Sequence, residues 1–158
     1  MPKDFVPVPL SELKTLTNGE FYDDEFSKGR YSTDASIYQI QPLAVFIPKS
    51  KDDVIKAVNF CLDNNISILP RGGGTSQCGQ TVNSSLVIDN SKYFNKIIDF
   101  DEKNKTCTVE PGIVLDELNK FLKPFGLWFP VDVSTSSRAT IGGMAGNNSC
   151  GGRSLKYG

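Results

Sequence analysis

Residues 66–76 run Ile-Ser-Ile-Leu-Pro-Arg-Gly-Gly-Gly-Thr-Ser, an apolar strand-like segment that leads directly into three consecutive glycines. Glycine has no Cβ, so the backbone N–H groups of such a loop can approach an anion closely. A single triple glycine fits a tight turn after a strand equally well. Residues 71–76 therefore predict either a turn or a phosphate-binding loop, and the flanking sequence has to decide between them.

The residues before this loop predict a β-α-β unit. Residues 43–47 form an apolar run that ends at a proline, which is typical of a short buried strand. Ser50 and Asp53 have the spacing of a capping box, and apolar residues follow at helical intervals up to Asn64 and Asn65. A strand, a helix and a second strand in such a short segment predict a parallel strand pair.

The residues after the loop predict three strands, a helix and a last short strand. Residues 85–89 have an apolar centre and predict a strand, and residues 96–100 and 106–109 predict the two halves of a hairpin. Residues 115–122 have apolar side chains at helical spacing, and a proline and a glycine follow. Residues 127–129 predict a final short strand.

The N-terminal quarter of the chain is less regular. Residues 10–16 predict a short helix whose start Ser11 is able to cap, and residues 22–34 are polar with charges of both signs. We interpret residues 1–40 as an N-terminal arm that covers another part of the protein, and assign residues 41–158 to the main domain.

Composition excludes several classes of function. The chain has 158 residues, of which 39% are hydrophobic and 22% charged, as expected for one soluble domain. A net charge of −1 without a local Lys/Arg cluster argues against nucleic-acid binding. The chain has no histidine and four scattered cysteines, so we expect no metal site and no imidazole-assisted nucleophile.

The start of the chain bears on localisation. Residues 1–10 lack the apolar core of a signal peptide, and no apolar run reaches the length of a membrane span. We therefore expect a cytoplasmic protein without a transmembrane segment.

A second glycine-rich segment lies about seventy residues after the first. Residues 141–153 run Ile-Gly-Gly-Met-Ala-Gly-Asn-Asn-Ser-Cys-Gly-Gly-Arg. Neither segment has the Lys-Ser or Lys-Thr that completes a P-loop, and Gln77 stands where a Rossmann fingerprint needs its third glycine. Two such loops suggest one extended ligand that is held at two points.

The motifs form an ordered series. Pro-Arg-Gly-Gly-Gly-Thr-Ser at residues 70–76 is followed by Val-Glu-Pro-Gly at 109–112, Ala-Thr-Ile-Gly-Gly at 139–143 and Ser-Cys-Gly-Gly at 149–152. This series resembles the FAD-binding domain of the vanillyl-alcohol oxidase / p-cresol methylhydroxylase (PCMH-type) family. Within that family it is most similar to the FAD-linked 2-hydroxy-acid dehydrogenases of the glycolate, D-lactate and D-2-hydroxyglutarate group.

The resemblance implies a fold and a cofactor. The fold is an α+β PCMH-type domain whose N-terminal, βαβ-containing subdomain has a mixed sheet, truncated before the second subdomain. The first loop would wrap the pyrophosphate of FAD, and the second would lie along the flavin or its ribityl chain. The residues implied to contact FAD are Arg71, Gly72, Gly73, Gly74, Thr75, Ser76, Gly79, Gln80, Ser134, Thr135, Ser136, Thr140, Gly142, Gly143, Asn147, Asn148, Ser149 and Gly151.

Several roles stay open at this point. Arg71 either neutralises phosphate or pairs with an acidic neighbour, and Asp132 either touches the cofactor or caps its loop. We interpret Cys78 and Cys150 as small loop residues rather than a redox pair, since no spacing places them within disulfide distance.

The resemblance also implies a function. The chain would be the FAD-binding portion of an oxidoreductase that oxidises a small 2-hydroxy acid by hydride transfer to FAD. The missing C-terminal flavin and substrate domains would belong to the same gene product or to a separate subunit. No residue qualifies as catalytic, so a non-catalytic flavin- or nucleotide-binding module and an inactive fragment remain alternatives. We expect the isolated chain to bind FAD weakly or not at all.

Overall fold

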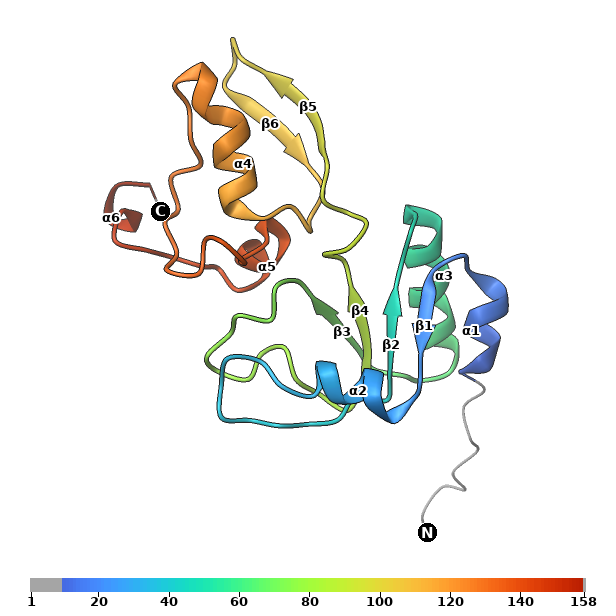
Figure 1. Cartoon of the computed structure of the whole chain (residues 1–158). Helices are drawn as coiled ribbons and strands as arrows, with labels where there is room; N and C mark the ends of the chain where they lie inside the picture. The colour runs from blue at the N-terminus through green and yellow to red at the C-terminus, as the bar shows by residue number, and fades with distance from the viewer. Residues whose placement is uncertain (1–9, 158) are drawn as a thin grey trace.

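Two sheets organise residues 10–157, the part of the chain that the computed structural model describes, into two lobes (Figure 1). Residues 1–9 and Gly158 lie outside the described residues. The first nine residues of the predicted arm, and most of the stretch considered as a signal peptide, are therefore not described. The sheet lobe contains α1 (Ser11–Leu16), β1 (Glu20–Tyr22), α2 (Glu25–Tyr31), β2 (Ala44–Ile47), α3 (Lys51–Asp63), β3 (Ile68–Arg71) and β4 (Leu86–Asp89). The hairpin lobe contains β5 (Ile97–Asp101), β6 (Thr106–Val109), α4 (Leu115–Leu122), the 3-10 helix η1 (Lys123–Phe125), α5 (Ile141–Gly146) and α6 (Ser154–Tyr157).

The first sheet has the strand order β1-β2-β4-β3. β4 pairs in parallel with both β2 and β3, and β1 pairs antiparallel with β2, so the sheet is mixed as expected. The expected direct pairing of the two strands of the β-α-β unit is wrong, because β4 lies between them. All four β4 residues are buried, which suits the centre of a sheet, whereas Pro70 in β3 lacks an N–H donor and suits an edge strand.

Both faces of the first sheet are covered. Helices α1 and α3 pack on one face, where Leu13, Phe46, Ala57 and Leu86 are fully buried. The opposite face has a smaller cluster centred on the alternate residues of β2 and β4. Residues 10–40 thus contribute a strand and a core side chain to the sheet lobe.

The predicted capping box of α3 is confirmed. The Ser50 hydroxyl accepts a hydrogen bond from the Asp53 N–H at 3.1 Å, and the Asp53 carboxylate accepts one from the Ser50 N–H at 3.0 Å. Asp53 also accepts from the backbone of Asn18 and Lys49. Burial raises the pKa of Asp53, but these hydrogen bonds outweigh burial and hold the pKa below its usual range.

Three local predictions need correction. α1 begins at Ser11 itself, and Leu10 takes the N-cap position without a side-chain hydrogen bond, so Ser11 does not cap it. Residues 127–129 form no strand, and the Phe129 N–H donates instead to the Asn119 side chain at 2.7 Å. The second glycine-rich segment begins as helix α5 rather than as a loop, because the Thr140 hydroxyl accepts from the Gly143 N–H and caps it.

The hairpin and helix α4 follow the prediction. β5 and β6 pair antiparallel, and α4 packs on them through Leu118 and Leu122. The chain then leaves helical geometry through η1 at Gly126, whose φ of +67° lies in the left-handed region. The other side of α4 contacts α5, where Leu115 and Met144 share a buried cluster.

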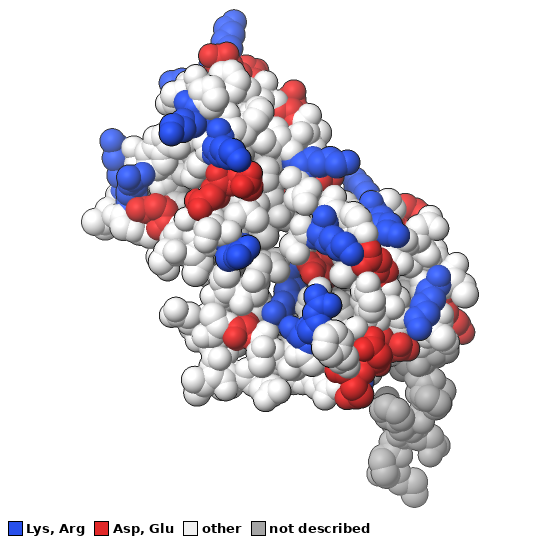
Figure 2. Space-filling view, viewed as in Figure 1, with Lys and Arg blue, Asp and Glu red and all other residues white. Residues whose placement is uncertain are grey.

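The surface shows no single dominant charge on the face in view. Figure 2 shows basic and acidic side chains interspersed over both lobes. The loops of residues 32–43 and 72–85, at the lower left of Figure 1, are largely uncharged in this view. Within residues 10–157, no helix combines the length and the apolar character that crossing a membrane requires.

Candidate functional site

The first glycine-rich loop meets the turn that leads into the second glycine-rich segment. A Cβ on Gly72 would collide with the Thr140 hydroxyl, and a Cβ on Gly73 would collide with the Arg138 carbonyl oxygen. Only glycine allows the loop after β3 to lie this close to residues 138–140. The first loop and residues 138–140 therefore form one continuous wall between the lobes.

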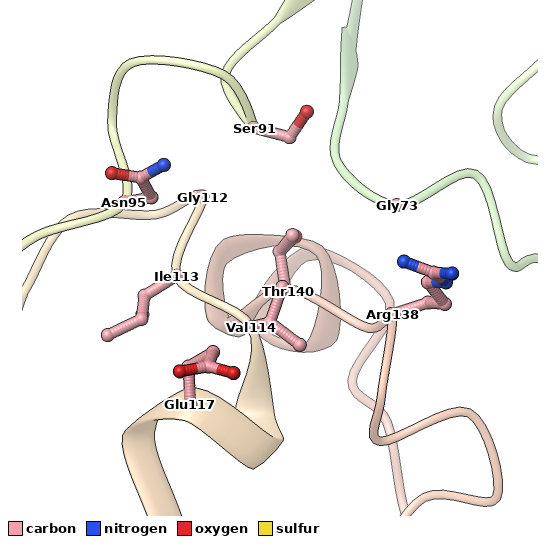
Figure 3. A pocket seen from close by; sticks show the side chains of 9 residues that line it. All are labelled: Gly73, Ser91, Asn95, Gly112, Ile113, Val114, Glu117, Arg138 and Thr140. Atoms are coloured by element: carbon pink, nitrogen blue, oxygen red, sulfur yellow. The ribbon is translucent and has the colours of Figure 1, made fainter. Parts of the chain in front are cut away.

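A pocket of about 410 Å³ opens beside this wall (Figure 3). Four segments build it: the loop after β3, the β4–β5 connection, the start of α4 and the turn before α5. The residues that line it are Gly73, Ser91, Asn95, Gly112, Ile113, Val114, Glu117, Arg138 and Thr140. Backbone, hydroxyl and amide groups thus share the lining with two oppositely charged side chains.

Close backbone contacts hold the pocket in shape. Gly112 donates its N–H to the Phe94 carbonyl at 2.6 Å, and a Cβ on Gly112 would collide with the Asn90 carbonyl oxygen. Gly142 packs in the same way against Pro111. These glycines let three chain segments approach one another without side chains between them.

Asp89 positions the Ser91 side of the pocket. Its carboxylate accepts hydrogen bonds from the Ser91 N–H at 2.8 Å, from the Ser91 hydroxyl at 2.7 Å and from the Tyr31 hydroxyl at 2.7 Å. Asp89 is only 7% exposed. Burial raises the pKa of Tyr31, and the hydrogen bond to the Asp89 carboxylate raises it further, so Tyr31 stays a neutral donor.

The predicted residues of the first loop divide into two groups. Gly73 lines the pocket, and Gly72 lies behind it against Thr140. The side chain of Arg71 instead donates to backbone carbonyls of the residues around Tyr31 and Thr81. These partners are backbone carbonyls rather than an acidic side chain, and a contact of Arg71 with phosphate stays a prediction.

The rest of the first loop closes on itself. The Ser76 hydroxyl donates to the Gln80 side chain at 2.8 Å and accepts from the Cys78 and Gln80 N–H groups. Gly74 and Gly79 have positive φ angles, which glycine adopts without strain. This turn, and with it Thr75, is outside the set of residues that line the pocket.

The predicted residues of the second segment divide similarly. Thr140 lines the pocket and caps α5, and the turn formed by Ser134, Thr135 and Ser136 supports it, since the Thr135 carbonyl accepts from the Arg138 N–H. Gly142 and Gly143 lie in α5. The remaining predicted residues, Asn147, Asn148, Ser149 and Gly151, follow α5 and are outside the pocket lining.

Asp132 acts within its own lobe. Its carboxylate accepts from the Arg153 N–H at 3.0 Å, and Gly151 packs against its backbone carbonyl. Of the two roles considered for Asp132, the contacts match holding the loop. All four cysteines are free, so Cys78 and Cys150 form no disulfide. Among residues 10–157, no cluster of three or more His, Cys, Asp or Glu side chains is placed to hold a metal ion.

Sequence reasoning missed several residues of the pocket. Arg138 stands inside the hydroxyl-rich turn that was predicted, and its charge was the signal available for including it. Gly112 belongs to the Val-Glu-Pro-Gly motif, which was recognised but given no role in binding. Ser91, Asn95 and Glu117 carry no motif, and only the tertiary structure brings them to the pocket.

Comparison with known proteins bears on this geometry. The family described as FAD binding domain matches residues 42–158, which include every residue that lines the pocket. The chain belongs to this FAD-binding family. The α+β fold and the PCMH-type resemblance are thereby confirmed, and the domain is related to 2-hydroxy-acid dehydrogenases and oxidases.

Curated relatives show the same relationship, and the match covers only a small part of each relative. The D-2-hydroxyglutarate dehydrogenase of Escherichia coli K12 is 43% identical over 130 residues, 80% of this chain and 13% of that protein. Glycolate oxidase subunit GlcD of Bacillus subtilis is 38% identical over 93% of this chain and 32% of that protein. The chain spans between 13% and 33% of the length of such relatives.

Solved structures show the same fold. The structure of an alkyldihydroxyacetonephosphate synthase superposes with a TM-score of 0.83 and 25% identity, and the match covers 94% of this chain and 30% of that one. A plant BBE-like protein from Physcomitrella patens, 18% identical, superposes with a TM-score of 0.72 and supports the fold alone.

Proposed function

We propose that this FAD-binding domain supplies the pyrophosphate-binding part of an oxidoreductase that oxidises a 2-hydroxy acid by hydride transfer to FAD. One observation carries the proposal: Gly73 of the first glycine-rich loop lines a single pocket together with Arg138 and Thr140, which belong to the turn before the second glycine-rich segment. FAD, when bound, supplies the hydride acceptor. The proposed substrate class is that of the related D-2-hydroxyglutarate dehydrogenase and glycolate oxidase.

The lining of the pocket fits the charge of a diphosphate. Arg138 provides a guanidinium, Thr140 provides a hydroxyl group, and the exposed backbone of Gly73 is free of a side chain. Glu117 stands across the opening from Ser91 in Figure 3, where its carboxylate suits hydroxyl donors such as those of a ribose. These residues bind and orient the cofactor, and no residue of the chain is assigned to the chemical step.

An NMR titration of the 158-residue chain tests the proposal. FAD and ADP should both shift the amide resonances of residues 72–76 and 138–143, even if binding is only millimolar. Riboflavin, which has no phosphate, is the matched control and should leave these resonances in place. Arg138→Met should weaken the FAD response more than Arg138→Lys, because Lys keeps the charge.

The same titration also defines the result that would contradict the proposed pyrophosphate site. If FAD at millimolar concentration leaves both segments unshifted in the folded wild-type chain, the proposed pyrophosphate site is wrong. Shifts that riboflavin reproduces would point to a site for the flavin ring instead.

A further inference from the structure

The side chain of Arg71 fastens the start of the first glycine-rich loop to a distant segment. Its Nη1 donates to the carbonyls of Tyr31 at 3.1 Å and Thr81 at 2.9 Å, and its Nη2 donates to the carbonyl of Thr33 at 2.8 Å. The guanidinium also lies over the Tyr31 ring, 5.2 Å from its centroid. One side chain at the end of β3 therefore joins three chain segments just before Gly72.

The far end of the same loop is tied to the same segment. We call residues 31–38 the bracket. The Asp34 carboxylate accepts from the Thr81 hydroxyl at 3.1 Å and from the Thr81 N–H at 3.4 Å. Gly79, with a φ of +73°, lies against the Tyr38 ring so closely that a Cβ would overlap it. The bracket thus contacts the loop near both of its ends.

The residue of the loop that lines the pocket and the residue that binds the bracket are different. Gly73 is the residue of this loop that lines the pocket, whereas Arg71 is outside the lining and binds the bracket. Arginine suits this task because its planar fork presents five donors in fixed directions. A lysine ammonium at the same position has the charge but cannot reach all three carbonyls, which lie on two different segments.

We propose that Arg71 is a positioning residue: it holds the glycine-rich loop in one arrangement against the bracket and does not itself contact the phosphates of the ligand. A loop ordered in advance binds its ligand without the cost of ordering on binding. The effect on affinity rests on the proposed FAD site, while the fastening itself rests on the contacts above. This role is an alternative to the phosphate contact that the sequence predicted for Arg71.

Hydrogen exchange of residues 72–82, followed by mass spectrometry on the chain without FAD, tests the fastening. Arg71→Met and Arg71→Lys should both speed exchange in this segment by about tenfold, because both lose hydrogen bonds from a charged donor. Arg138→Met and Arg138→Lys are the matched controls, since Arg138 lines the pocket but makes none of these contacts. They should leave exchange in residues 72–82 at the wild-type rate.

FAD titration of the same four variants separates positioning from direct contact. Arg71→Lys should lose as much affinity as Arg71→Met, because the lost feature is the fork and not the charge. At Arg138, Lys should retain more affinity than Met. Arg71→Lys with wild-type affinity and wild-type exchange would overturn the proposal.

A second variant keeps the test decisive if the Arg71 variants do not fold. Asp34→Asn leaves all three Arg71 contacts in place but weakens the tie to Thr81, so exchange at Thr81 and Val82 should still accelerate. Unchanged exchange there, in a variant with wild-type melting, would show that the bracket does not order the loop. If the wild-type chain binds no FAD at all, the proposed function fails, while the exchange experiment still decides the fastening.

Discussion

The two glycine-rich segments have similar compositions but different secondary structures. The first stays a loop after β3 and is held by two side chains: Arg71, at its start, reaches out to the bracket, and Asp34 of the bracket reaches Thr81. The second becomes helix α5 and is held by its own cap, Thr140, and by close packing of Gly142 on Pro111. Glycine content alone therefore predicts close chain approach, and the neighbours decide whether a loop or a helix results.

The largest expected effect comes from filling the contact between the two segments. Gly73→Ala should destabilise the chain by about 1–3 kcal/mol, because the new Cβ would meet the Arg138 carbonyl, a backbone atom that cannot rotate away. Gly146→Ala is the matched control, since a Cβ there meets nothing within 4 Å, and it should be neutral or slightly stabilising. Urea unfolding of both variants measures the difference, and equal stabilities would refute the close contact.

An intermediate effect is expected from the cap of the second segment. Thr140→Val removes the oxygen that accepts from Gly143 and should cost about 1 kcal/mol. Thr140→Ser keeps the oxygen and should retain most of that stability. Exchange should accelerate in residues 141–146 and stay unchanged in residues 72–76 if the two segments are held independently.

The smallest expected effect is the response of the first segment to acid. Burial raises the pKa of Asp34, but hydrogen bonds from Ser36 and Thr81 outweigh it and lower the pKa. A group with a lowered folded pKa stabilises above its unfolded pKa, and that contribution is lost as the pH falls through the folded pKa. Acid should therefore loosen the loop before residue 82 by about 1 kcal/mol or less.

Asp34→Asn provides the control for this response. Its loop should already be loose at neutral pH and should change little as the pH falls. The measurement is exchange in residues 72–82, corrected for the intrinsic pH dependence of exchange. A wild-type loop that stays equally protected through the acid range would contradict the role of the Asp34 carboxylate.

The elements that were predicted correctly depend on short-range signals. The capping box of Ser50 and Asp53, the apolar run of β2 and the hairpin of β5 and β6 are all encoded within a few residues. The strand predicted at 127–129 was wrong because its apolar residues pack onto α4 from an extended segment without a partner strand. The short apolar pattern alone does not distinguish these outcomes.

Within the candidate site, the sequence by itself determined that glycine-rich and hydroxyl-rich segments would exist, and their ordered series indicated the FAD-binding family. The tertiary structure decided that the first loop touches the turn before the second segment, that Ser91 and Glu117 join them at one pocket, and that Arg71 points to the bracket. The physical reason is the separation along the chain of the residues that interact. Caps, turns and strand patterns depend on residues that are close together in the chain. The strand order instead places β3 beside β4, and the Arg71 side chain at the end of β3 binds the carbonyl of Tyr31, which lies 40 residues earlier.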